Sequence, residues 1–149
     1  MKKNTVDVND IPEGFVEVQT GAAFAMRNGP YFEKTIDENT MIRAFRADER
    51  HMNGLNFVHG GMLMSFADSS LARAINHQHN QRCVTVKMNS EFLLPVRGGD
   101  WIEAHTEVVR NTKSVVFVRG ELKVGKKVVF KADAIFHHVK DDKKRMSPK

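Results

Sequence analysis

Apolar residues recur with the period of an α-helix along one stretch, from about Gly60 to Gln78. They fall on two lines, made of Leu63, Ala67 and Ala74 and of Met64, Leu71 and Ile75. Residues three, four and seven apart share a helix face, so this stretch predicts a helix that is apolar in most directions and buried in most directions. Arg73, Asn76 and His77 mark the strip of this helix that we expect to be exposed.

Strand-like patterns lie on both sides of this helix. MIRAFRA, at 41–47, alternates apolar and polar residues, and four runs follow the helix: CVTVKMNSEFLL, WIEAHTEVVR, SVVFVRGELKV and KVVFKADAIFHHV. Their connections, PVRGGD, NTK and GK, are short and rich in turn residues, which indicates antiparallel pairing between successive strands. VGKKV, at 124–128, predicts a tight hairpin, and residues 18–28 fit either a helix or a first strand.

The predicted order is therefore one or two strands, a long helix and four antiparallel strands. This order is typical of an α+β fold in which a curved antiparallel sheet of five to six strands packs on one helix. A single sheet can bury a helix that is apolar nearly all round only by wrapping it. We expect one domain over 16–139, between a flexible segment at 1–15 and a basic flexible tail at 140–149.

The composition is that of an ordinary globular protein, with 41% hydrophobic and 28% charged residues. No apolar run approaches the roughly 18 residues that a membrane span needs, and MKKNTVDVND lacks the apolar segment of a signal peptide. The single cysteine, Cys83, excludes an internal disulfide, fits a reducing compartment and is interpreted as a strand residue rather than a nucleophile. We therefore expect a cytoplasmic protein without a membrane partner.

The net charge of +5 is concentrated at the two ends of the chain. Lys2 and Lys3 supply two positive charges, and five basic against two acidic residues at 140–149 supply three more, so residues 4–139 are neutral. Basic ends of this kind are more typical of solvated tails than of a nucleic-acid surface, and we expect no nucleic-acid partner. The contrary hypothesis predicts an affinity that falls steeply with salt and is lost when the tail is deleted.

One carboxylate, Asp68, lies on the otherwise apolar line of Met64, Leu71 and Ile75. A buried unpaired carboxylate is costly, so Asp68 either pairs with a neighbouring group or takes part in chemistry. The helix also begins with Gly60 and Gly61. The first N–H groups of a helix lack intrahelical partners, so these glycines either permit a tight turn or expose donors to an anion or oxyanion.

Gly60 and Asp68 are eight residues apart, which is about 12 Å along a helix that rises 1.5 Å per residue. A donor to a carbonyl oxygen and a base for the same carbonyl must both lie within roughly 3–3.5 Å of the reacting atoms. One helix therefore cannot present both groups to one carbonyl, whereas two antiparallel copies can. An active site made of these groups requires a two-fold dimer.

The stretch NGLNFVHGGMLMSFADSS carries Asn53, His59, Gly60, Gly61 and Asp68 at a characteristic spacing. This pattern resembles the hotdog-fold acyl-CoA thioesterases, in the phenylacetate-degradation (PaaI-like) branch of the 4-hydroxybenzoyl-CoA thioesterase superfamily. CVTVKMNSEFLLPVRGGD also resembles this family, and the resemblance covers about residues 40–138. It implies a long helix wrapped by an antiparallel sheet, and a homodimer or homotetramer in which two sheets become continuous.

The resemblance also implies roles for individual residues. The Gly60 N–H would polarise the carbonyl of an aryl- or medium-chain acyl-CoA, and His59 and Asn53 would orient the loop or the thioester. Asp68 of the partner subunit would act as nucleophile or general base, and the Thr85 hydroxyl would help to hold the water. The products would be free CoA and a carboxylic acid.

Substrate-binding residues implied in the same way are Gly61, Phe57 and Ser69, and no metal or cofactor is expected. Four basic residues near turns or strand ends are candidates for the CoA phosphates: Arg97, Arg110, Lys113 and Arg119. Two other functions stay open. One is a non-catalytic acyl-CoA or lipid-binding module on the same fold, and the other is a related dehydratase or hydratase.

Overall fold

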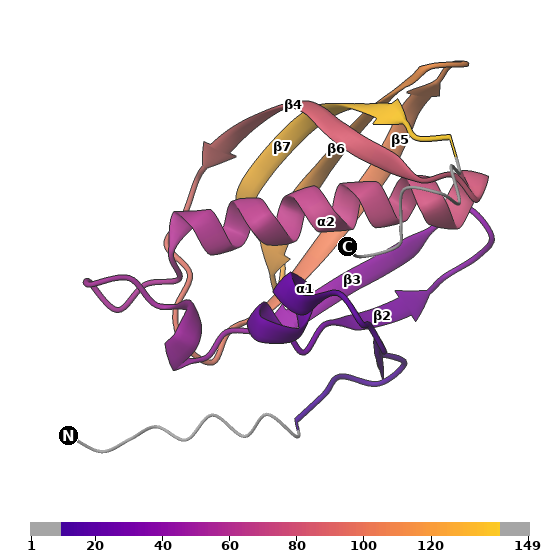
Figure 1. The fold of residues 1–149 in the computed structure, drawn as a ribbon. Helices are drawn as coiled ribbons and strands as arrows, with labels where there is room; N and C mark the ends of the chain where they lie inside the picture. Colours follow the sequence, from indigo (N-terminus) through magenta and orange to yellow (C-terminus); the bar gives the residue numbers. More distant parts are fainter. Residues whose placement is uncertain (1–9, 141–149) are drawn as a thin grey trace.

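The computed structural model describes residues 10–140, and the predicted flexible ends at 1–15 and 140–149 fall mostly outside this range. A curved antiparallel sheet wraps one long helix, α2 (Gly60–His79), as Figure 1 shows. The strands are β1 (Val16–Glu17), β2 (Phe32–Thr35), β3 (Met41–Arg46), β4 (Cys83–Phe92), β5 (Trp101–Asn111), β6 (Val115–Val124) and β7 (Lys127–His138). A short helix α1 (Ala23–Asn28) and the 3₁₀ turn η1 (Glu49–His51) complete the described part. The α+β prediction is confirmed, with seven strands instead of five to six.

The strand order is β1-β2-β3-β5-β6-β7-β4, and every pairing is antiparallel. The expectation that successive strands pair is wrong for β4 and β5, because β4 pairs with β7 and β5 pairs with β3 and β6. The connection at 93–100 passes the beginning of α2 instead of forming a hairpin. It is held there by the Val58 N–H, which donates to the Val96 carbonyl at 2.8 Å, and by a bridge between Phe57 and Arg97.

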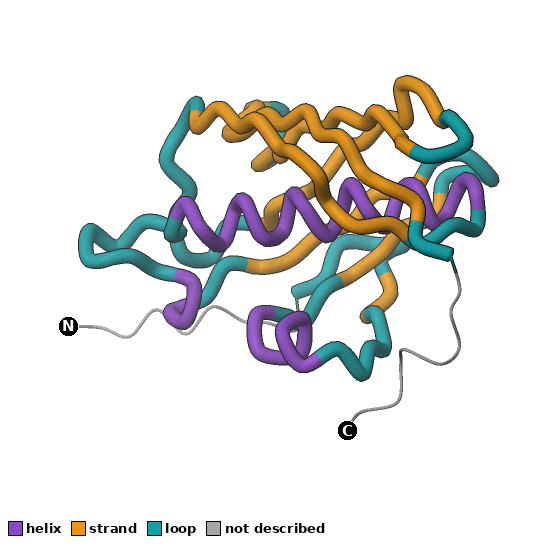
Figure 2. The backbone as a smooth tube through the Cα atoms, turned by 45° about the horizontal axis from the view of Figure 1, so that its top comes forward, coloured by secondary structure: helices purple, strands orange, loops and turns teal. Residues whose placement is uncertain are grey.

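This topology leaves β4 at an open edge of the sheet, alongside α2 (Figures 1 and 2). Most of its residues are exposed, including Val84 and Val86, whose exposed fractions are 54% and 61%. An edge strand presents unpaired backbone N–H and C=O groups, and apolar side chains on such an edge favour pairing with another strand.

The core lies between α2 and the concave face of the sheet. The helix contributes Phe66, Leu71 and Ile75, and the sheet contributes residues such as Phe45 and Phe130. The helix approaches the sheet closely over Gly120 of β6, where an added Cβ would lie 3.1 Å from Leu71 Cδ2. No helix within residues 10–140 has both the length and the apolar character needed to cross a membrane.

The helix strip predicted to be exposed is instead partly buried, because β2 and the segment after it cover that side of α2. Arg73 donates to both carboxylate oxygens of Glu33 in β2, at 2.8 and 3.1 Å, and to Asn76 Oδ1 at 3.1 Å. His77 Nε2 lies 3.1 Å from the Asp37 carbonyl oxygen. The polar strip therefore connects the helix to β2 and to the segment after it while staying partly exposed.

Candidate active site

The first residues of α2 leave one backbone donor free. His59 is the N-cap, and its Nδ1 accepts from the Gly61 N–H at 2.8 Å. The His59 carbonyl accepts from the amides of Met62 and Leu63. Gly60 N–H has no acceptor within residues 10–140, so it is an open donor at the positive end of the helix dipole.

The loop before α2 is shaped by Asn53. Its Oδ1 accepts from the amides of Leu55 and Phe57 at 2.9 and 3.1 Å, and its own N–H donates to the Phe57 carbonyl at 2.7 Å. An Asn side chain that bonds the backbone ahead of it closes a tight turn. Asn53 thus orients the loop that leads into Gly60, and the Phe57 ring lies against the Arg97 guanidinium, 5.3 Å from ring centroid to Cζ.

His51 supports the same loop. It is 3% exposed, and its Nε2 donates to the Asn28 carbonyl at 2.8 Å while its Nδ1 accepts from the Asp48 N–H at 3.0 Å. The His51 carbonyl in turn accepts from the His59 N–H at 2.7 Å. His51 therefore links α1 and η1 through its buried imidazole, and the N-cap of α2 through its carbonyl.

Asp68 faces the edge strand. Its Oδ1 accepts from the Thr85 hydroxyl of β4 at 2.5 Å, and no cation of the described residues pairs with it. The partner of this carboxylate is therefore a neutral hydroxyl rather than a basic side chain. A register shift between Thr85 and Lys87 bulges the strand next to this contact.

Cys83 lies near the same carboxylate. Burial, reinforced by the negative charge of Asp68, raises the pKa of the Cys83 thiol, and the residue belongs to β4. A raised pKa keeps the thiol protonated near neutral pH, which agrees with its interpretation as a strand residue rather than a nucleophile.

Phe92, at the other end of β4, is a site neighbour that sequence reasoning missed. A Cβ added to Gly60 would lie 3.1 Å from Phe92 Cε1, so the ring lies against the helix start. Phe92 packs edge-on against Phe130, with ring centroids 5.1 Å apart, yet it is 53% exposed. Leu93 and Leu94, which follow it in the chain, are also exposed, so three successive apolar side chains are open to solvent, and Phe92 is the one shown to border the free amide.

The structure gathers most of the predicted residues into two groups. Asn53, Phe57, His59, Gly60 and Gly61 meet at the start of α2, and Asp68 meets Thr85 two turns further along. Ser69 belongs to neither group.

Ser69 lies on the side of α2 that faces β3. Its hydroxyl accepts from Arg43 Nη1 at 2.8 Å and donates to the Phe66 carbonyl at 3.2 Å. Burial lowers the pKa of the Arg43 guanidinium, which lies 3.8 Å from Glu33 and 4.7 Å from the Tyr31 ring centroid. Ser69 therefore anchors the helix to a buried arginine, and its predicted contact with substrate has no support in this geometry.

A long helix wrapped by a curved antiparallel sheet is the arrangement of the hotdog fold. Residues 55–131 match the family described as the thioesterase superfamily, and the chain belongs to this family. The predicted family, fold class and enzyme class, a thioester hydrolase, are confirmed.

Two sequence relatives and one solved structure illustrate this membership. "Putative esterase PA0474" of Pseudomonas aeruginosa is 32% identical over 86% of this chain and 97% of its own length. Mouse acyl-coenzyme A thioesterase 13 is 24% identical over 62% of this chain and 73% of its own length. The structure of the Escherichia coli PaaI protein from the phenylacetic acid degradation operon superposes with a TM-score of 0.73. It is 26% identical and covers 80% of this chain and 86% of that chain.

Proposed function

We propose that the protein is an acyl-CoA thioesterase that hydrolyses an aryl- or medium-chain acyl-CoA to free CoA and a carboxylic acid. In a homodimer, the Gly60 N–H of one subunit polarises the thioester carbonyl, and Asp68 of the partner subunit acts on the carbonyl carbon directly or through water. The proposal rests on two groups near the open sheet edge. The Gly60 amide has no acceptor within the described residues, and the Asp68 carboxylate is bonded to a neutral hydroxyl rather than to a cation.

The geometry of α2 and β4 supports the two-fold arrangement. Within one chain, Gly60 contacts Phe92, and Asp68 contacts Thr85. A two-fold axis that brings Gly60 beside Asp68 of the partner subunit therefore also brings Phe92 beside Thr85 of the partner subunit. Placing Phe92 beside Thr85 of the partner subunit pairs β4 antiparallel with its copy. This pairing would give hydrogen-bond partners to the exposed backbone groups of the edge strand.

The chemistry of a thioester suits this small set of groups. The thiolate is a good leaving group and needs little acid assistance, so one oxyanion donor and one carboxylate suffice. In the general-base form, Asp68 takes a proton from water as the C–O bond forms, and the C–S bond then breaks with that proton going to the CoA thiolate. In the nucleophilic form, Asp68 Oδ attacks the carbonyl carbon, the C–S bond breaks to release the CoA thiolate, and water then hydrolyses the resulting anhydride, which restores the Asp68 carboxylate and supplies the proton that the thiolate takes up. Thr85 orients the carboxylate in both forms.

The acyl-CoA class of substrate is supported by the name of the mouse relative and by the exposed apolar ring of Phe92 beside the donor. The cytoplasmic location, the absence of nucleic-acid and membrane partners, and the choice between dimer and tetramer stay predictions.

The test is release of free CoA thiol from a panel of acetyl-, octanoyl-, benzoyl- and phenylacetyl-CoA, with wild type and Asp68→Asn compared. Asn keeps the size and the acceptor oxygen for Thr85 but lacks the charge. We expect turnover of at least one long or aromatic substrate and a loss of at least about a hundredfold in kcat for the variant. Saturable acyl-CoA binding without product would instead indicate the non-catalytic module, and full activity of Asp68→Asn would exclude the proposed chemistry.

A further inference from the structure

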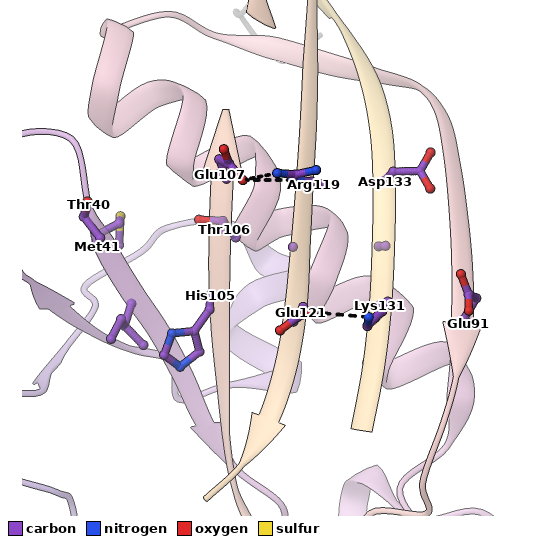
Figure 3. A pocket seen from close by; sticks show the side chains of 13 residues that line it. Thr40, Met41, Glu91, His105, Thr106, Glu107, Arg119, Glu121, Lys131 and Asp133 are labelled. Atoms are coloured by element: carbon purple, nitrogen blue, oxygen red, sulfur yellow. Dashed lines mark hydrogen bonds and ion pairs between the residues drawn. The ribbon is translucent and has the colours of Figure 1, made fainter. Parts of the chain in front are cut away.

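On the outer face of the sheet, polar side chains pair with one another around a hollow of about 580 Å³, which Figure 3 shows. Arg119 donates to Glu107 at 2.8 Å, and Lys131 lies 3.6 Å from Glu121. These pairs join neighbouring strands and lie away from the start of α2, so they have no bearing on the Gly60 amide.

His51 is a buried polar residue that does reach the start of α2. Its carbonyl accepts from the His59 N–H at 2.7 Å, and the antiparallel bridge between Met52 and Val58 lies beside this bond. The loop of residues 51–59 therefore begins and ends on one hydrogen bond. This bond ties the N-cap of α2 directly to the end of η1.

The orientation of His59 decides where the Gly60 N–H points, because this N–H and the His59 carbonyl belong to one planar peptide group. Three groups of His59 are held: its N–H by the His51 carbonyl, its Nδ1 by the Gly61 N–H at 2.8 Å, and its carbonyl by amides in the first turn of α2. Of these three contacts, the one to His51 comes from outside the helix. The His51 carbonyl therefore places the peptide that carries the open donor relative to the rest of the chain.

The imidazole of His51 in turn fixes the position of its own backbone. Nε2 lies 2.8 Å from the Asn28 carbonyl at the end of α1, and Nδ1 lies 3.0 Å from the Asp48 N–H. A carbonyl can only accept and a backbone N–H can only donate, so the ring is neutral and carries its proton on Nε2. The Phe45 ring packs edge-on against it, with ring centroids 5.2 Å apart. His51 cannot shift without leaving a donor and an acceptor unpaired, and its exposed fraction of 3% gives water little access to replace them.

We propose that His51 is a positioning residue for the hydrolysis, which holds the Gly60 amide where the thioester oxygen becomes an oxyanion. The inference rests on the proposed function, and it extends the candidate site to α1, whose last carbonyl anchors the imidazole. An oxyanion donor is effective over only a few tenths of an ångström, and a misplacement of about 1 Å costs about a hundredfold in rate. His51 therefore acts on kcat through the backbone, without contacting the substrate.

The experiment compares His51→Phe with His51→Gln in the thiol-release assay. Phe keeps a planar ring that packs on Phe45 but neither donates nor accepts, whereas Gln offers an N–H donor and a carbonyl acceptor. His51→Phe should lower kcat about 10- to 100-fold with KM within about twofold of wild type, and His51→Gln should stay within about fivefold of the wild-type kcat. The control is Ile75→Val, a fully buried position near the other end of α2, which weakens the core and should leave kcat unchanged.

A double-mutant cycle with Gly60→Pro separates positioning from a purely structural role. Proline has no N–H, so this variant lacks the donor that His51 is proposed to hold. Adding His51→Phe to Gly60→Pro should therefore lower kcat by less than about twofold more. An equal loss in both backgrounds, or a loss confined to KM, overturns the inference, because His51 would then support only the fold or the binding of substrate.

Hydrogen exchange of the His59 amide, followed by NMR, gives a readout that does not depend on turnover. Exchange at a loop amide follows local opening, so His51→Phe should accelerate it at least about tenfold, and Ile75→Val should change it by less than about threefold. An unchanged rate in His51→Phe overturns the inference whatever the activity. If wild type hydrolyses no thioester, the proposed function fails, and the exchange rate still decides whether the His51 side chain holds the peptide that carries the Gly60 amide.

Discussion

Replacing Gly60 by proline removes the proposed oxyanion donor with little disturbance of the helix. Gly60 is the first residue of α2, a position that proline favours, and its N–H makes no hydrogen bond within the described chain that would be lost. The preceding residue, His59, has φ −58° and ψ 134°, the extended conformation that a residue before proline adopts. The remaining cost is steric, because the new Cβ would lie 3.1 Å from Phe92 Cε1 and the ring must give by a few tenths of an ångström.

Gly60→Ala introduces the same Cβ and keeps the N–H, so the ratio of the two variants isolates the donor. Removal of one oxyanion donor costs about 2.7–4 kcal/mol of transition-state stabilisation, or about 10²–10³ in kcat. We therefore expect kcat of Gly60→Pro to be about 10²–10³ below that of Gly60→Ala in the thiol-release assay. Both variants should unfold within about 1 kcal/mol of each other in urea. A ratio below about threefold, with both variants folded and dimeric, would refute the assignment of the Gly60 amide.

The same variant tests whether the two groups come from different chains. In a heterodimer of Gly60→Pro and Asp68→Ala subunits, one site contains both defects and the other contains neither. Random mixing by co-refolding makes about half of the dimers mixed and should recover about a quarter of wild-type activity. No recovery above that of the separate variants would mean that donor and carboxylate act within one chain or not at all.

Three further predictions concern neighbouring residues. Thr85→Val should lower kcat about 10- to 100-fold because it removes a hydrogen bond to a charged group, and Thr85→Ser should restore most of it. Gly120→Ala should cost about 1–3 kcal/mol in urea unfolding, since its Cβ would crowd Leu71 at 3.1 Å and the core cannot yield freely. Because Asp68 contributes to the raised pKa of Cys83, Asp68→Asn should lower that pKa, and the iodoacetamide alkylation profile of Cys83 should shift to lower pH. An unshifted alkylation profile would mean that the Asp68 charge does not act on the Cys83 thiol.

The elements of the candidate site were predictable because their signals are local. The apolar period of 3.6 residues predicts α2 from Gly60 to within a residue of its observed end. The two glycines after His59 predict an open helix start. Eight residues of helical rise separate Gly60 from Asp68, which is too far for both groups to act on the same carbonyl. These inferences need only the geometry of a single helix.

Strand order and the surroundings of each side chain depend on contacts between residues far apart in the sequence. Local alternation identifies β4 and β5 but carries no information on their neighbours, so the pairing of β4 with β7 was missed. The same limit applies to Ser69, whose bond to Arg43 joins residues 26 positions apart, and to the cover that β2 gives Arg73.

By itself, the sequence determined the helix and the strands, since each follows from spacing along one element. It also predicted Gly60 and Asp68 as the candidate groups and a second chain to unite them, and both of these stay predictions. Only the tertiary structure decided that β4 forms the open edge and that Thr85 holds Asp68. Those features arise where separate elements pack together, and the packing is selected by the burial of the whole core rather than by any short stretch of residues.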